Sequence, residues 1–369
     1  AGRAPRSGPR MTAHMSRADH LSGRDEGDLK VVSLGGGHGL AASLSALRRL
    51  TSELTGVVTV ADNGGSSGRL RDELGVLPPG DLRMALAALC GDDEWGRTWA
   101  GILQHRFTAD GPLHEHAVGN LLIAGIWDQL GDPVAGLDLV AELLGAQGRV
   151  LPMAAVPLDI EAEVHLRSAP DRLTVVRGQT QVASVDGQVV SVRLDPHDPP
   201  ACPEAVAAVD SADWIVVGPG SWFTSVMPTL LVPGVRDALV RTRARRILVL
   251  NLTEQAGETE GLTPNDHLEV LAAHAPEFKL DAVIADPTLV DAKGHLESTA
   301  MSLGARLIVA DVAVSLGSDQ HDPVRLAAAF GRTMRQAESG DRHVNRREFC
   351  RMAMTAQVKA ELAAAPRGG

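Results

Sequence analysis

The stretch VVSLGGGHGLAASLSALRRL, residues 31–50, decides the fold class of this chain. It begins with an apolar run, Val31–Leu34, whose continuous pattern is typical of a parallel strand buried on both faces. Four glycines follow within five positions, and a helical pattern of leucines starts at Leu40. A strand, a glycine turn and a helix place a helix N-terminus against a phosphate. We therefore expect a Rossmann-like α/β fold, with a mostly parallel sheet and helices on both faces.

The glycine turn is the first candidate ligand site. Residues Gly37–Ala42 fit the G-x-G-x-x-A form of the dinucleotide-binding fingerprint. The next expected strand, Gly56–Ala61, ends at Asp62, which lies 25 positions (62 − 37) after Gly37, where an acidic residue can hold a ribose hydroxyl. Tight packing between strand and helix is the alternative explanation of the glycines. The candidate site residues of this turn are Gly36, Gly37, His38 and Gly39.

A second glycine-rich loop, NGGSSGR at residues 63–69, follows the second expected strand. It joins flexible backbone, two hydroxyls and a guanidinium, which suit phosphate oxygens. Loops after successive strands of an open α/β sheet meet at the carboxyl edge, where ligands bind. The next helix starts close behind, and its Asp81 is either a site residue or only a helix cap. The candidates from this region are Asp62, Asn63, Ser66, Ser67, Arg69, Asp81 and Arg83.

Two polar residues before the next apolar helix are also candidates. His116 and Asn120 are four residues apart and can face a ligand from a helix entrance, with helix capping as the alternative. His114 and His116 are only two residues apart and cannot share a helix face, so the spacing does not predict a zinc pair. We therefore assign His116 and Asn120 to ligand binding and expect no metal ligands.

The strand–glycine–helix layout recurs from Trp214 onward, in WIVVGPGSWFTSVMPTLL. Its GPGS turn is a third candidate phosphate loop, in which the serine can cap the following helix. Another expected strand, Ile247–Asn251, precedes a polar loop. The candidates from these two loops are Gly218, Gly220, Ser221, Thr224, Asn251, Gln255, Glu258 and Thr259.

Four segments of the chain, GGGHGL, VTVADNGGSSGRLR, LPPGDLRMAL and GPGSWFTSVMP, together resemble the YvcK family of gluconeogenesis factors. The resemblance covers roughly residues 30–330. It implies that the chain binds UDP-N-acetylglucosamine and acts in the control of cell-wall synthesis and cell shape, coupled to growth on gluconeogenic carbon. It also implies a relation to 2-phospho-L-lactate transferase, an enzyme of deazaflavin cofactor synthesis. Asn63 stands where the commoner family pattern has a second aspartate, and Gln320 where it often has arginine.

Three function classes are weighed against these observations. A regulator that binds the nucleotide sugar without turnover fits the three glycine loops, because no nucleophile–base pair is evident and no catalytic residue is predicted. A transferase of the phospho-lactyl type is the alternative, although the family's Pro-Asp-x-Asp element, which contacts the deazaflavin, is replaced here by Pro170–Leu173. An NAD oxidoreductase rests on the glycine fingerprint alone. We expect no required cofactor, and Mg²⁺ is not favoured because Asn63 leaves Asp62 without an adjacent carboxylate.

The composition limits the kinds of partner and the cellular compartment that we expect for the protein. A formal net charge of −11 argues against a nucleic-acid-binding surface. No apolar run reaches the roughly 18 residues that a membrane span needs. Cys90, Cys202 and Cys350 are widely spaced and match no metal or disulfide pattern, so a reduced cytoplasmic protein is expected. The expected partners are a nucleotide sugar and a regulatory protein, with a Ser/Thr kinase and a homo-oligomer left open.

The expected domain organisation follows from changes in composition along the chain. Residues 1–28 are polar and are expected to form a disordered leader. A single domain is expected over residues 29–330, and residues 331–369 are expected to be a flexible tail. A β-rich insertion at about residues 152–200 is expected to cover one side of the cleft, because short alternating segments replace the strand–helix rhythm. Its expected strands are Ile160–Leu166, Leu173–Val176, Gln181–Val185 and Val189–Leu194.

Overall fold

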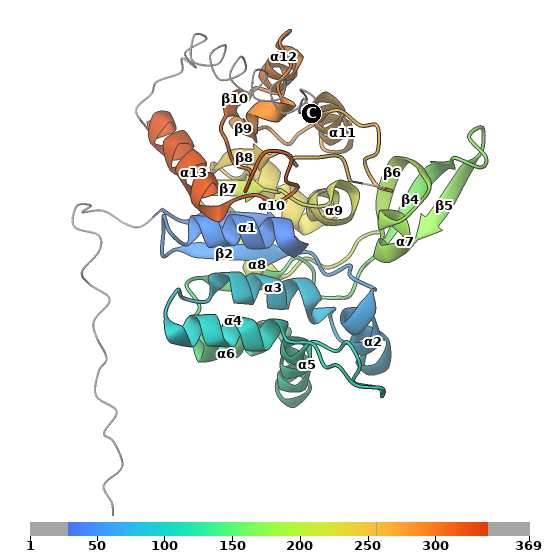
Figure 1. The fold of residues 1–369 in the computed structure, drawn as a ribbon, viewed down its shortest axis with the longest axis vertical. Helices are drawn as coiled ribbons and strands as arrows, with labels where there is room; N and C mark the ends of the chain where they lie inside the picture. Colours follow the sequence, from blue (N-terminus) through green and yellow to red (C-terminus); the bar gives the residue numbers. More distant parts are fainter. Residues whose placement is uncertain (1–28, 256, 339–369) are drawn as a thin grey trace, which may run out of the picture.

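The computed structural model describes residues 29–255 and 257–338, so the expected leader and residues 339–369 of the expected tail lie outside the described residues. Its centre is a seven-stranded sheet in which all paired neighbours are parallel, which confirms the predicted fold class (Figure 1). Across the sheet, the strands are β3 (Arg149–Pro152), β2 (Leu54–Val58), β1 (Val31–Gly35), β7 (Trp214–Val217), β8 (Arg245–Val249), β9 (Ala282–Ala285) and β10 (Arg306–Val309).

The order of the sheet reverses at β1. The chain runs outward from β1 through β2 to β3, and later returns to pair β7 with the other side of β1. All residues of β1 are buried, as expected for the centre of a parallel sheet that is covered on both faces. A reversal of this kind opens a crevice at the carboxyl ends of the strands on either side of it.

Helices cover both faces of the sheet (Figure 1). One face carries α1, α3 and α13, the other carries α8 and α10, and α4 to α6 form an outer group beyond α3. None of the helices between residues 29 and 338 has the length and apolar character that crossing a membrane requires. The helices outside the insertion are α1 (Gly37–Leu47), α2 (Gly65–Leu74), α3 (Pro79–Leu89), α4 (Glu94–Gln104), α5 (Val118–Leu130), α6 (Pro133–Leu144), α8 (Pro203–Ser211), η1 (Trp222–Val226), α9 (Met227–Leu231), α10 (Pro233–Arg241), α11 (Pro264–His274), η2 (Pro287–Leu289), α12 (His295–Ser302) and α13 (Pro323–Glu338).

Leucines hold α1 on the sheet. Leu40, Leu44 and Leu47 are at most 1% exposed, and burying one leucine side chain stabilises the fold by about 1.5–3 kcal/mol. Gly56 of β2 permits this contact, because a Cβ there would lie 3.1 Å from Leu44 Cδ1. The packing fixes the N-terminus of α1 beside the carboxyl end of β1.

The β-rich insertion is present as a three-stranded antiparallel sheet in the order β5-β4-β6. Its elements are β4 (Asp159–Leu166), β5 (Leu173–Arg177), α7 (Gln179–Ala183) and β6 (Gly187–Asp195). The strand expected over Gln181–Val185 is wrong, because most of this segment belongs to the short helix α7. Val182 and Val185 are both buried and lie three residues apart, a spacing that one helical turn places on the same side.

Helix α13 extends beyond residue 330, where the sequence predicted the end of the domain. It continues to Glu338, and Thr333 and Met334 are buried within it. Thr333 Oγ1 donates a hydrogen bond to Ala329 O at 2.9 Å, so its hydroxyl is satisfied inside the helix. The polar composition concealed an amphipathic pattern, in which residues after Phe330 continue the apolar stripe that packs on α1.

Candidate ligand-binding site

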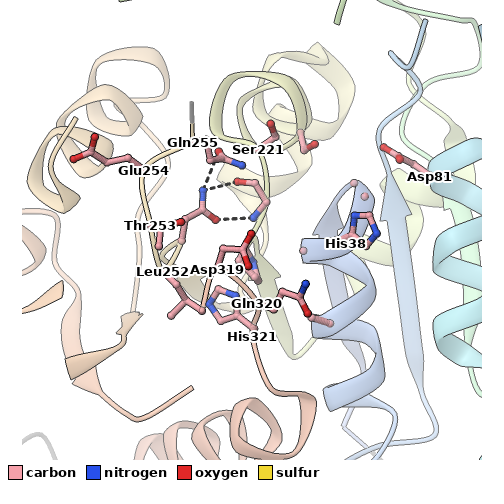
Figure 2. Close-up of a pocket in the computed structure, with 18 of the residues that line it drawn as sticks. His38, Asp81, Ser221, Leu252, Thr253, Glu254, Gln255, Asp319, Gln320 and His321 are labelled. Atoms are coloured by element: carbon pink, nitrogen blue, oxygen red, sulfur yellow. Dashed lines mark hydrogen bonds between the residues drawn. The ribbon is translucent and has the colours of Figure 1, made fainter. Parts of the chain in front are cut away.

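A cavity of about 770 Å³ lies at the carboxyl ends of β1 and β7, where the sheet order reverses. Its volume is in the range typical of small-molecule sites. The loop after β1, the loop after β7 and the loop after β8 form its walls, and the loop before α13 adds a further side (Figure 2). Figure 2 shows His38 and Asp81 on one side, Thr253 and Glu254 on the opposite side, and His321 between them.

The N-terminus of α1 is the most favourable place in this cavity for an anion. Its N-cap residue is Gly36, which has no side chain to cap the helix, and the Asp81 carboxyl accepts a hydrogen bond from the Gly37 N–H. Gly37 has a φ of 57°, and a Cβ added there would meet nothing within 4 Å, so the backbone faces open space. Uncapped N–H groups and the helix dipole together attract phosphate oxygens. His38 is exposed beside them on the cavity wall.

Asp81 is a buried carboxyl that reaches the same helix end. Burial, followed by the charge of Asp62, raises its pKa to about 7, while a hydrogen bond from the Gly37 backbone and the charge of Arg83 oppose this rise. A Cβ on Gly36 would lie only 2.5 Å from Asp81 Oδ2, which places the carboxyl directly against the glycine turn. Asp81 can therefore gain or lose a proton near neutral pH within the cavity.

Two amide side chains fix the loop after β7. Asn251 Nδ2 donates to Gly220 O at 2.8 Å, and Asn251 Oδ1 accepts from Gly220 N at 2.9 Å (Figure 2). Gln255 Oε1 accepts from Asn251 Nδ2 at 3.2 Å and from Trp222 N at 3.1 Å. Both amides line the cavity, and their hydrogen bonds hold the backbone of the opposite loop in place.

Four of the expected site residues lie behind this loop and do not line the cavity. Glu258 is 4% exposed, and it accepts hydrogen bonds from Ser221 Oγ and from Phe223 N, the latter at 2.8 Å. Burial raises the pKa of Glu258, and these hydrogen bonds oppose the rise. Thr259 Oγ1 accepts from Gln255 N at 2.8 Å, which supports the same loop. The four residues are Gly218, Thr224, Glu258 and Thr259.

Gly39 lines the cavity but is required by packing between two loops. A Cβ at this position would lie 2.2 Å from Pro219 O and 2.7 Å from Gly220 Cα. Real Cβ atoms do not approach backbone so closely, so a side chain would separate the loop after β1 from the loop after β7. The glycine is therefore explained without any contact to a ligand.

Comparison with known proteins assigns the chain to a family. A family model described as "2-phospho-L-lactate transferase CofD" matches residues 31–319. The chain belongs to the CofD family. Within this family it groups with the gluconeogenesis factors, as the motifs around the three glycine loops predicted.

Curated relatives and a solved structure agree with this CofD-family assignment. A "Putative gluconeogenesis factor" of Mycobacterium tuberculosis (strain H37Rv) is 55% identical over 304 residues, covering 81% of this chain and 89% of the relative. One of the same name from Mycobacterium leprae is 54% identical, covering 81% and 84%. The crystal structure of a UPF0052-family protein from Bacillus halodurans has a TM-score of 0.74 and 32% identity, covering 83% of this chain and 99% of that one.

A second set of expected site residues in this CofD-family chain forms a buried polar cluster between α2, α3 and α5. Ser66 Oγ lies 2.9 Å from His116 Nδ1, and it accepts hydrogen bonds from Asn120 Nδ2 at 3.0 Å and from Ala117 N at 3.3 Å. Burial, followed by the charge of Arg69, lowers the pKa of His116, so its neutral ring can accept the Ser66 proton. Ser66, His116 and Asn120 therefore join α2 to α5 away from the cavity lining, and Asn120 Oδ1 has no hydrogen-bond partner among the described residues.

Arg83 lies buried on α3 beside this cluster, where the charges of Asp81 and Asp62 act on its guanidinium. It is 4% exposed, and its Nε and Nη1 have no hydrogen-bond partner among the described residues. Burial, followed by the charge of Arg106, lowers its pKa to about 10. Gly119 of α5 makes room for its stem, because a Cβ there would lie 2.8 Å from Arg83 Cγ.

The remaining candidates of the second loop make internal contacts. Arg69 donates to the carbonyl oxygens of Pro112 and His114, at 3.1 and 2.6 Å, and so ties α2 to the segment between α4 and α5. Asp62 Oδ1 accepts from Gly64 N at 2.9 Å and shapes the loop itself. Ser67 is buried, and a Cβ on Gly80 would lie 2.3 Å from its Oγ.

Asn63 contacts the insertion. Its Oδ1 accepts from Thr180 N at 3.0 Å and from Thr180 Oγ1 at 2.9 Å, and its Nδ2 donates to Gln181 Oε1 at 3.0 Å. The residue that replaces the second aspartate of the family pattern thus anchors α7.

Several cavity-lining residues were absent from the sequence-based set. Thr253 and Glu254 follow β8, and Asp319–His321 lie in the loop between β10 and α13, so their position after strands of the same sheet was the available signal. His321 Nε2 donates to Leu250 O at 3.2 Å, and burial lowers the pKa of its imidazole to about 4. Gln179 comes from α7, for which the sequence pattern gave no signal.

Proposed function

We propose that this CofD-family protein binds UDP-N-acetylglucosamine in the switch-point cavity and acts as a regulatory protein. The observation that carries the proposal is the N-terminus of α1, which begins after Gly36 without an N-cap side chain and lines the cavity together with the Gly220–Ser221 turn. A diphosphate can take hydrogen bonds from this helix N-terminus, whereas the Gly220 N–H already donates to Asn251 Oδ1. The amide, hydroxyl and carboxyl groups along the walls match the hydroxyls and acetamide of an amino sugar.

The regulatory part of the proposal rests on the relatives. They are called gluconeogenesis factors, a name that describes a metabolic role and no reaction. We propose that the bound state of the cavity is read by a protein partner, which links carbon metabolism to cell-wall synthesis and cell shape. The proposal requires no metal and no turnover of the nucleotide sugar.

A second candidate function is a group transfer of the kind named in the family model. Asp81 favours it, because a carboxyl with a pKa of about 7 beside a phosphate site suits general acid–base chemistry. In that case a hydroxyl of the deazaflavin would attack the lactyl phosphate of a nucleotide-activated donor, forming a new phosphodiester bond, and the nucleoside monophosphate would leave as the P–O–P bond breaks.

Calorimetry and mass spectrometry on the purified full chain separate these functions. UDP-N-acetylglucosamine is expected to bind and to be recovered unchanged. At 100 times its dissociation constant it adds about 2.7 kcal/mol, a rise of about 5 °C in the unfolding midpoint. NAD is expected to give no rise. Product in the deazaflavin assay would replace the regulator by the transferase, and no binding of any uridine nucleotide sugar would remove the proposal.

A matched pair of variants tests the role of the α1 N-terminus. Asn and Asp tolerate the left-handed backbone of Gly37, and the space beside it is open. Gly37→Asp adds a negative charge where the diphosphate is proposed to bind, whereas Gly37→Asn adds almost the same volume without charge. We expect the aspartate variant to bind UDP-N-acetylglucosamine about ten- to a hundredfold more weakly than the asparagine variant. Equal affinities would place the diphosphate elsewhere.

A further inference from the structure

Helix α7 brings the insertion to the cavity. Its first residue, Gln179, is the one insertion residue in the cavity lining of the described chain. Figure 1 shows α7 where the insertion meets the main body of the protein, whereas β5 lies on the outer side. The insertion thus reaches the ligand space through a single amide side chain.

Asn63 determines where α7 lies. Its three hydrogen bonds, at 2.9–3.0 Å, engage the backbone and hydroxyl of Thr180 and the amide of Gln181. Both partners directly follow Gln179 in the chain. A shift of α7 relative to the loop after β2 would break these bonds, so Asn63 fixes the position of Gln179 over the cavity.

Two glycines allow neighbouring loops to pack closely against α7. Gly178, with a φ of 100°, is the N-cap residue of the helix, and a Cβ there would lie 2.5 Å from Asn63 Nδ2. On the other side Gly257, with a φ of 79°, lies so close that a Cβ would be 2.9 Å from Ala183 O. Val182 between them is fully buried. The helix is therefore held between the loop after β2 and the loop after β8.

Other residues of the cavity wall have a different chemistry. Leu252 and the His321 ring also line the cavity, and Leu252 is 7% exposed. Burial lowers the pKa of His321, so its ring is neutral at physiological pH. An apolar side chain and a flat neutral ring suit a nucleobase. Gln179, which offers both hydrogen-bond donors and an acceptor, suits hydroxyls and an acetamide.

We infer that Gln179 is a specificity-determining residue that contacts the sugar of the bound nucleotide sugar, and that Asn63 is the positioning residue that holds it there. The inference rests on the proposed function, because it assigns the sugar and the base of the proposed ligand to different residues of the cavity wall. The inference assigns a function to the insertion, because the specificity for the ligand then depends on a segment outside the parallel sheet.

Calorimetric titration of UDP-N-acetylglucosamine and of UDP into the full chain tests this inference. Gln179→Ala is expected to weaken binding of the nucleotide sugar about three- to tenfold, the effect of a neutral hydrogen bond, and to leave binding of UDP within about twofold. Gln188→Ala, an exposed glutamine of β6 in the same insertion, is the matched control and is expected to change neither affinity.

The role of Asn63 is tested by a double-mutant cycle. Asn63→Ala is expected to reproduce the selective loss of nucleotide-sugar affinity, and Asn63→Ala combined with Gln179→Ala is expected to bind no more weakly than Gln179→Ala alone. Asn63→Asp keeps the acceptor for Thr180 and is expected to restore most of the selectivity. A purely structural role would reduce the affinities for UDP and for the nucleotide sugar together.

The outcomes separate the inference from the proposed function. If the parent chain binds neither UDP nor the nucleotide sugar, both are overturned. If the parent binds the nucleotide sugar and Gln179→Ala binds it equally well, or loses UDP to the same extent, the inference alone is overturned. Additive losses in the double variant would overturn the positioning role of Asn63 and leave that of Gln179.

Discussion

The loops around the cavity and the buried polar cluster contain similar residue types but use their hydrogen-bonding groups differently. At the cavity, the N-terminus of α1 has no N-cap side chain, and Gly37 at its start faces open space. In the buried polar cluster, Ser66, His116 and Asn120 bond to one another. Sequence motifs reveal which groups can bind phosphate, whereas only the fold reveals which groups remain available for it.

Asp81 lies between the two regions, and its substitution is expected to have the largest effect on the free energy of unfolding. Its pKa is about 7 in the folded protein against 3.8 in the unfolded chain, so the folded state keeps a proton that the unfolded state releases. Stability therefore falls as pH rises from about 4 to 7, by up to about 4 kcal/mol for this group. Asp81→Asn is expected to remove this dependence, which urea denaturation of both proteins between pH 4 and 8 would measure. Parallel pH curves for the two proteins would contradict it.

Gly39 and Gly37 belong to one turn and are expected to respond in opposite ways. Gly39→Ala drives a Cβ into the Pro219 backbone and is expected to cost about 3 kcal/mol of unfolding free energy. Gly37→Asn meets open space and is expected to cost about 1 kcal/mol or less. Denaturant midpoints of the two variants provide the measurement. Similar losses would mean that the two glycines do not differ in packing.

Two buried arginines extend the comparison, because they differ in how far their guanidinium groups are hydrogen-bonded. Arg246 is 9% exposed, and its guanidinium donates to Leu239 O and Thr242 O, both at 3.0 Å. Arg246→Met leaves these carbonyls unpaired and is expected to cost about 2 kcal/mol. Arg83→Met removes a buried charge whose Nε and Nη1 have no hydrogen-bond partner among the described residues, and it is expected to be neutral or stabilising. A loss at Arg83 equal to that at Arg246 would show that Arg83 is satisfied in solution.

The smallest expected effect separates stability from binding. Ser66→Ala leaves the Asn120 amide and the Ala117 N–H without their acceptor and is expected to cost about 1–2 kcal/mol of unfolding free energy. Affinity for UDP-N-acetylglucosamine is expected to stay within twofold. His38→Ala, at an exposed position on the cavity wall, is expected to weaken binding instead. Calorimetry of both variants measures the affinity, and thermal unfolding measures the stability. A loss of affinity in Ser66→Ala would show that the buried polar cluster contributes to ligand binding.

The sequence predicted the fold because its signals are local. Each strand–glycine–helix unit, such as Val31–Leu47, carries its own apolar run and its own turn, so the parallel sheet could be inferred, whereas the strand order and its reversal at β1 depend on pairing between distant segments. The cavity wall also contains residues whose position depends on distant packing. Gln179 reaches the ligand space because Asn63, 116 positions earlier (179 − 63), anchors the residues that follow it. Nothing in the pattern of α7 alone reports that contact.

The position of β1 has a consequence for how the chain folds during synthesis. Its neighbour on one side is β2, but on the other side Val31 pairs with Trp214, 183 residues later in the chain (214 − 31). At a synthesis rate of about 5–20 residues per second, that partner emerges roughly 10–40 s after β1. During this interval the central apolar strand has one open edge, which favours wrong pairing or aggregation. The central strand of the native sheet therefore keeps an unpaired edge throughout this interval, and the growing chain has to prevent wrong pairing there until β7 is synthesised.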